Sequence, residues 1–113
     1  MRLLLGSGGL RTPERQQIYF DEMGSIFAGC EEVVFIPYAS YDHAGYTTRL
    51  AEFSAPSGVS LRNIDDYENP ISAIEEAKGL YVGGGNTFLL TKKLHENALI
   101  DVVRSRVRDG MPY

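Results

Sequence analysis

Cysteine, clustered basic residues and long apolar runs are all scarce in this sequence. The single cysteine, Cys30, excludes an internal disulfide and suits a reducing compartment, so we expect a cytoplasmic protein. The 11 basic residues are outnumbered by 15 acidic ones and form no basic run, which argues against nucleic acid or an anionic membrane as a partner. The apolar start, MRLLL, stops at Gly6 and is too short for a signal peptide. No stretch approaches the ~18 apolar residues that a membrane span needs.

What is present is the composition of an ordinary globular protein. Of the 113 residues, 43% are hydrophobic and 23% are charged, which is enough for one hydrophobic core. We find no internal repeat, linker or low-complexity segment. Residues 1–113 are therefore expected to belong to a single domain.

Short apolar runs alternate with helical patterns, which predicts βαβ units and a parallel sheet. The predicted strands are Leu3–Leu5, Glu32–Ile36, Val59–Ile64 and Leu80–Val82. Five helices are predicted, of which the first begins at Thr12-Pro13 and the second runs through Tyr46–Phe53. The third starts at Asn69-Pro70 and ends at Gly79, and the last two cover Phe88–Leu94 and Ala98–Arg108. The expected fold is an α/β open parallel sheet with helices on both faces.

Four loops follow the predicted strands, at the edge where open α/β sheets bind ligands. They read GSGG, PYASYDH, IDDYEN and GGGNTF. The last contains three consecutive glycines, which weaken regular structure unless something approaches the backbone. A nucleotide phosphate is disfavoured, because G-x-G-x-x-G fails at both glycine loops, where the last position is Arg11 or Phe88, and no Gly-Lys-Ser/Thr is present.

An oxyanion is the better candidate ligand for the glycines. Acyl transfer needs backbone N–H donors aimed at the developing negative charge, and Gly85 and Asn86 are best placed to supply them. A plain strand-to-helix turn, with Asn86 or Thr87 as the N-cap, explains Asn-Thr and one glycine. It does not readily explain three glycines.

Other polar residues at the same edge are candidates for the substrate pocket. We expect Gly84, Ser7, Ser40 and His43 to line it, because they lie in the loops that follow the strands. His95 ends an amphipathic helix and Cys30 lies on an apolar helical stripe, so both are expected to be structural. The acidic cluster Asp65, Asp66 and Glu68 is typical of a solvated turn. No metal and no cofactor is expected.

These motifs resemble a known family. GGGNTF after a short apolar strand, together with FIPYA, is similar to peptidase E, the α-aspartyl dipeptidases, which are serine peptidases with the flavodoxin-like fold of class I glutamine amidotransferases. The likeness extends through LLLGS, PYASYDHAGY, NPISAIEEAKGLYVGGGNTFLL and RVRDGMPY. It implies cleavage of small peptides, dipeptides with an N-terminal aspartate (Asp-Xaa). It also implies an oxyanion hole at Gly85 and Asn86.

The resemblance also implies that part of the catalytic site is missing. In the family, the tyrosine that matches Tyr113 is followed by Ile-Gly-x-Ser-Ala-Gly, so the serine would lie about four residues further on. The histidine and the third triad member come later still, which rules out His43 and His95 for that role. We therefore expect residues 1–113 to be the N-terminal half of the domain, truncated before the nucleophile strand.

Two expectations follow for the chain on its own. It should be inactive, and it should self-associate through the open edge of its sheet and the apolar stripes Leu90/Leu94 and Leu99/Val103/Val107. The alternative is a non-catalytic truncated relative, which binds a small carboxylate or acts as an interaction module.

Overall fold

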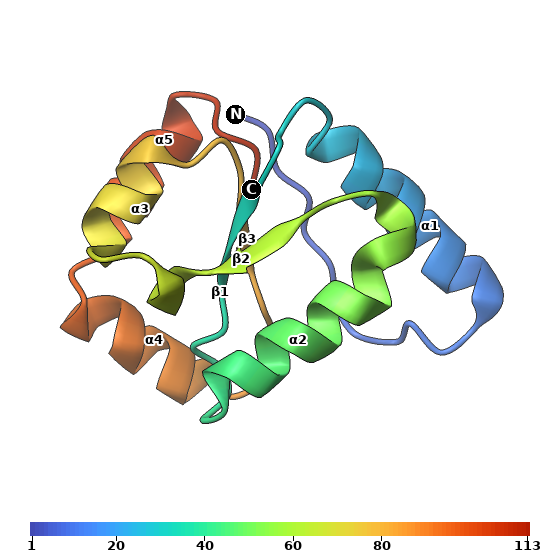
Figure 1. The fold of residues 1–113 in the computed structure, drawn as a ribbon, viewed down its shortest axis with the longest axis horizontal. Helices are drawn as coiled ribbons and strands as arrows, with labels where there is room; N and C mark the ends of the chain where they lie inside the picture. Colours follow the sequence, from blue (N-terminus) through green and yellow to red (C-terminus); the bar gives the residue numbers. More distant parts are fainter.

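A three-stranded parallel sheet separates two groups of helices in the computed structural model, which describes all residues 1–113 (Figure 1). The strands are β1 (Val33–Ile36), β2 (Leu61–Asn63) and β3 (Leu80–Val82), in the spatial order β2-β1-β3. The helices are α1 (Pro13–Ile26), α2 (His43–Ser54), α3 (Pro70–Glu76), α4 (Thr87–Glu96) and α5 (Ile100–Arg108). The predicted α/β class with helices on both faces is confirmed.

The central strand β1 supplies side chains to both faces of the sheet. Val34 and Ile36 belong to the larger core cluster, which α3, α4 and α5 cover. Val33 belongs to the second cluster, under α1, and Phe35 packs edge-to-face on Tyr46 of α2 at a ring distance of 5.3 Å. All four residues of β1 are buried, as the apolar run VVFI predicts.

The predicted helix starts are formed by side-chain caps. Thr12 Oγ1 accepts a hydrogen bond from the Arg15 amide at 3.2 Å, and Pro13 follows as the first helical residue. Asn69 Oδ1 accepts from the amides of Ile71 and Ser72 at 2.9 and 3.3 Å. These caps fix where α1 and α3 leave the loops.

The strand predicted at Leu3–Leu5 does not form. Residues 2–4 instead pair with a single residue: Tyr113 donates to the carbonyl of Arg2 at 3.0 Å, and Leu4 donates to the carbonyl of Tyr113 at 2.7 Å. Pro112 in turn accepts from the Leu80 amide at 2.9 Å, so the last residues lie between β3 and the N-terminal segment. Two hydrogen bonds to one residue are too few to define a strand.

Other predicted boundaries shift as well. β1 starts at Val33 rather than Glu32, and β2 spans three residues rather than six. The helix α3 ends at Glu76, and Gly79 is not its cap. Gly79 is instead needed for packing, because a Cβ there would lie 2.8 Å from the Phe27 ring.

The apolar stripe predicted to be exposed on α5 is largely covered. Leu99, just before this helix, is 0% exposed, and Val103 and Val107 are half-buried against the larger core cluster. The prediction that Leu99, Val103 and Val107 form an exposed apolar stripe is therefore wrong for Leu99 and holds only in part for the two valines. The reason is that α5 packs on α3, and that its valines pack against the core cluster to which Val34, Ile36 and Leu80 of the sheet belong.

Candidate active site

The GGGNTF segment forms a corner where β3 turns into α4, and hydrogen bonds tie this corner to the end of β1. Gly83 donates its amide to the carbonyl of Ile36 at 3.1 Å, and Asn86 donates to the carbonyl of Ala39 at 3.0 Å. The Asn86 side chain is the N-cap of α4, because its Oδ1 accepts from the Leu89 amide at 3.0 Å. The corner therefore has a fixed position at the carboxyl edge of the sheet.

The three glycines of the corner serve different purposes. A Cβ at Gly83 would lie 2.6 Å from the Tyr46 hydroxyl and 2.8 Å from the Phe35 ring, so only glycine fits there. Gly85 has a φ of +142°, and a Cβ would lie 2.9 Å from the Ala39 carbonyl oxygen. A Cβ at Gly84 would meet nothing within 4 Å. Packing explains Gly83 and Gly85, whereas Gly84 faces open space.

Backbone donors at the corner are unevenly engaged. The amides of Gly84 and Gly85 donate to no acceptor within the chain, and both residues are exposed. The Asn86 amide, expected as an oxyanion donor, is occupied by its bond to Ala39. The free donors within the glycine run are therefore Gly84 and Gly85, and an oxyanion would have to displace the Ala39 carbonyl to reach Asn86.

Tyr46 supports the corner from α2. Its hydroxyl donates to the Gly84 carbonyl at 2.8 Å, while its ring packs on Phe35. Burial raises the pKa of Tyr46, nearby Tyr81 adds to the increase, and the Arg49 guanidinium opposes it. The hydroxyl thus stays a neutral donor at ordinary pH, which orients the Gly84 peptide.

Two hollows open on either side of Gly84 and Tyr46. The Ser40 hollow, of about 590 Å³, is lined by Ala39, Ser40, Tyr41, Tyr46, Arg49, Leu50, Phe53, Gly84 and Gly85. The Ser7 hollow, of about 640 Å³, lies between the Gly6–Gly9 loop, α1 and β3, and Gly84 and Tyr46 line it too. Ser7, Ser40 and Gly84 were predicted to line the substrate pocket. Ser40 lines the first hollow, Ser7 lines the second, and Gly84 lines both.

His43, the fourth residue expected in the pocket, lines neither hollow. Its Nδ1 lies 2.6 Å from Asp65 Oδ2, and its ring packs on Tyr38 at 5.4 Å. Burial, with a smaller contribution from the Asp65 carboxylate, raises the pKa of Tyr38 to about 12. His43 therefore joins the start of α2 to the loop after β2.

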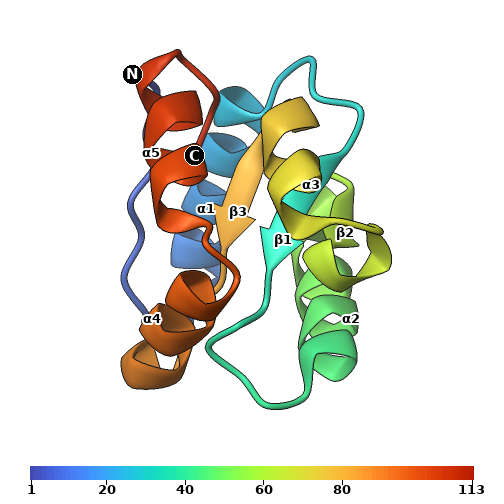
Figure 2. The same ribbon diagram turned by 90° about the vertical axis from the view of Figure 1, so that its left-hand side faces the viewer.

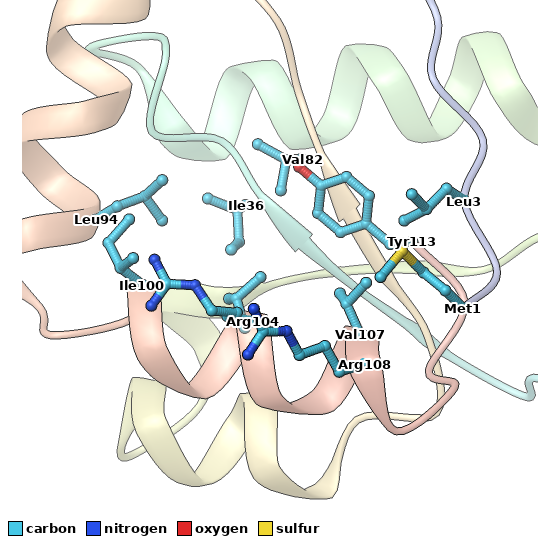
Figure 3. A pocket seen from close by; sticks show the side chains of 11 residues that line it. Met1, Leu3, Ile36, Val82, Leu94, Ile100, Arg104, Val107, Arg108 and Tyr113 are labelled. Carbon is cyan, nitrogen blue, oxygen red and sulfur yellow. The ribbon is translucent and has the colours of Figure 1, made fainter.

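A third hollow, the Val103 hollow, lies on the α5 side of the sheet (Figure 3). Its volume is about 460 Å³, and nine of its 11 lining residues are hydrophobic, among them Leu3, Val82, Val103 and Tyr113. Arg104 and Arg108, both on α5, also line it. The Val103 and Ser7 hollows share Val82 and Tyr113 as lining residues.

The remaining candidates, Cys30 and His95, line none of the three hollows. The Cys30 thiol donates to the Lys78 carbonyl at 3.3 Å, and the His95 carbonyl accepts from Ala98 in the turn after α4. No three His, Cys, Asp or Glu side chains gather as a metal site would require. None of the helices has the length and apolarity to cross a membrane.

Two residues of the corner's surroundings were missed by sequence reasoning. Tyr46 was named only as the start of the predicted helix Tyr46–Phe53, and Arg49 was not considered. The available signal was their spacing of three residues directly after the PYASYDH loop, which places both on one face of the helix.

Comparison with known proteins identifies the family. The model of peptidase family S51 matches residues 2–113. The chain belongs to this family. It is similar to Peptidase E of Streptomyces coelicolor (36% identity over 90 residues), to a Drosophila melanogaster protein named as a probable alpha-aspartyl dipeptidase (37% over 87), and to Peptidase E of Salmonella newport (41% over 87).

These matches cover 75–80% of this chain but only 36–38% of the three relatives. The chain thus spans little more than a third of the length of the curated relatives it matches. A solved structure of a Listeria monocytogenes protein assigned to Peptidase E superposes with a TM-score of 0.63 at 24% identity. The superposition covers 83% of this chain and 49% of the Listeria chain, which supports the S51 fold for this protein.

Proposed function

We propose that this chain is the N-terminal part of a serine-type dipeptidase that hydrolyses peptides with an N-terminal aspartate. The observation that carries the proposal is the pair of free amides, Gly84 and Gly85, at an exposed strand-to-helix corner between two hollows. Such donors stabilise the oxyanion of acyl transfer. The names of the Streptomyces, Drosophila and Salmonella relatives support the same activity.

The pairing of the last residues supports a position for the nucleophile in this proposal. In a parallel ladder, a residue bonds to the two neighbours of its partner. Tyr113 bonds to Arg2 and Leu4 and so stands opposite Leu3, while the bond from Leu80 to Pro112 places Leu80 opposite Tyr113. Four residues further along these registers lie Ser7 and Gly84. The family motif expects its serine about four residues after Tyr113, which is level with both.

In this proposal the serine attacks the peptide carbonyl, and the Gly84 and Gly85 amides hold the resulting oxyanion. The serine, the histidine and the third triad member are supplied by residues beyond Tyr113, as the family resemblance implies. The tyrosine–carbonyl bond from Tyr46 to Gly84 keeps the donor peptide in place during the reaction.

The test is Gly84→Val in a protein that carries these residues followed by the nucleophile segment. Because a side chain at this position meets open space, the substitution should leave the melting temperature unchanged and block the approach of the substrate carbonyl. We expect turnover of Asp-Leu to fall about 100- to 1000-fold. Gly85→Val is a poorer test, since its Cβ would strike Ala39.

Unchanged turnover in Gly84→Val would contradict the assignment of the donors. A protein that binds Asp-Leu without cleaving it would favour the alternative, a non-catalytic module that binds a small carboxylate.

We also propose that the 113-residue chain by itself lacks dipeptidase activity and self-associates. The β3 edge that faces Pro112 is paired at the Leu80 amide only, and the Val103 hollow beside it is largely apolar. Size-exclusion chromatography with light scattering tests the second statement. A monomer at ~100 μM with a cooperative melt would contradict it.

A further inference from the structure

Arg49 is the one charged residue that lines the Ser40 hollow. The other lining residues are aromatic, aliphatic or small, and they include the Gly84 and Gly85 corner. Tyr46 precedes Arg49 by three residues, so the two side chains lie on the same face of α2, and Leu50 and Phe53 continue this face. The hollow therefore combines a single cation with free backbone donors.

The Arg49 guanidinium is available to a ligand. It takes part in none of the ion pairs of the chain, although acidic residues outnumber basic ones by 15 to 11. Its charge acts on the Tyr46 hydroxyl, whose pKa it lowers against the effect of burial. That hydroxyl is bonded to the Gly84 carbonyl, so the cation is electrostatically coupled to the corner.

The Ser7 hollow on the other side of Gly84 is a poorer place for an anion. Its arginine, Arg15, donates to the Gly9 carbonyl at 3.2 Å, and Glu22 lines the same hollow. A carboxylate there would meet an engaged guanidinium and a like charge. The Ser40 hollow is therefore the more favourable of the two for a negatively charged substrate group.

We propose that Arg49 is a specificity residue that binds a carboxylate of the peptide substrate in the Ser40 hollow, while the Gly84 and Gly85 amides receive the scissile carbonyl. This inference rests on the proposed function and adds the group that binds the negative charge of the substrate. A contact with the side-chain carboxylate selects an N-terminal aspartate, whereas a contact with the C-terminal carboxylate selects a free C-terminus. Guanidinium–carboxylate pairs form two parallel hydrogen bonds, which fix the substrate's orientation as well as its charge.

The experiment measures binding by the 113-residue chain, which needs no nucleophile. Labelling with [15N]glycine gives signals from only 12 glycines, and the spectrum of Gly84→Ala assigns Gly84. The chain is titrated with Asp-Leu, with Asn-Leu, which lacks the side-chain carboxylate, and with Asp-Leu amide, which lacks the C-terminal one. Arg49→Gln and Arg49→Lys are compared with Arg11→Gln, a control that removes an exposed charge lining none of the three hollows.

We expect Asp-Leu to shift the Gly84 signal, and Arg49→Gln to weaken its binding about tenfold. Arg49→Lys should recover part of this loss, and Arg11→Gln should bind like the parent. Asn-Leu and Asp-Leu amide each lack one of the two carboxylates of Asp-Leu, and Arg49→Gln should leave the affinity for one of these two peptides unchanged. The carboxylate that this peptide lacks is the one which Arg49 contacts.

Equal affinity of Arg49→Gln and the parent for all three peptides, with Gly84 still shifting, would overturn the role of Arg49 and leave the corner's assignment standing. An equal weakening for all three probes would also overturn it, since no carboxylate would then be recognised. Absence of any shift at Gly84 in the parent would instead count against the proposed function itself.

Discussion

Replacing Gly83 by alanine should destabilise the fold, because the glycine lies against two aromatic rings. A Cβ would lie 2.6 Å from the Tyr46 hydroxyl and 2.8 Å from Phe35 Cζ, both far inside contact distance. Phe35 is 0% exposed and has no space to move, so Tyr46 must shift and lose its bond to Gly84. Overpacking costs about 1–3 kcal/mol, and the lost hydrogen bond costs about 1 kcal/mol.

Restricting the unfolded chain returns about 0.4–1 kcal/mol, so the net loss of unfolding free energy is about 2 kcal/mol. For a domain of this size, the melting temperature should fall by roughly 10 °C. Urea and thermal denaturation followed by circular dichroism measure both quantities. The matched control is Gly84→Ala, one residue further along, where the Cβ meets nothing and stability should be unchanged or slightly higher.

A double-mutant cycle with Tyr46→Phe isolates the cause. Removing the hydroxyl should cost about 1 kcal/mol in the parent but little in Gly83→Ala, where the bond is already broken. If Gly83→Ala melts at the same temperature as Gly84→Ala, the close approach of Tyr46 and Phe35 to the corner is not what requires glycine at this position.

Three further substitutions test other parts of the fold. Arg106→Met should lower stability by about 1–2 kcal/mol in urea denaturation, because the Arg106 guanidinium donates to the Ala77 carbonyl at 2.7 Å. Arg104→Met removes only an exposed ion pair and should cost under about 0.5 kcal/mol. Equal losses of stability in the two variants would contradict this prediction. Asn69→Ala should cost about 1 kcal/mol by removing the cap of α3, and an unchanged thermal midpoint would argue against that cap. Tyr38 has a pKa of about 12 in the folded protein and about 10 when unfolded, so the stability that it contributes is complete below pH 10 and is lost as the pH rises toward 12. The melting temperature of Tyr38→Phe should therefore fall less steeply than that of the parent between pH 10 and 12. Parallel curves for the two proteins would refute the assignment.

Local signals in the sequence were enough to predict much of the fold. Leu80–Val82 is bounded by glycines on both sides and was predicted at its observed length. The helix starts at Pro13 and Pro70 were predicted because a cap and a proline act within one turn of the chain. The segment Leu3–Leu5 failed because a strand needs a partner, and here the partner is one residue 109 positions away from Leu4.

The candidate site was predicted only in outline, for a similar reason. The corner at GGGNTF could be recognised from its glycines, but their individual roles depend on what packs against each one. Tyr46 reaches Gly84 across 38 residues, through the docking of α2 beside β1, and no local pattern records that contact. Arg49 became visible only when that helix face was placed beside the corner.

The strand order β2-β1-β3 also has a consequence for how the chain is made (Figure 2). The central strand is synthesised first, and both of its neighbours come later: β2 ends 27 residues after Ile36, and β3 ends 46 residues after it. At a synthesis rate of ~5–20 residues per second, about 2 to 9 seconds pass before both strands that pair with the apolar segment VVFI have been synthesised. A nascent chain that stalls in this interval presents an unpaired hydrophobic strand, and chaperone binding to the ribosome-bound protein should be concentrated there.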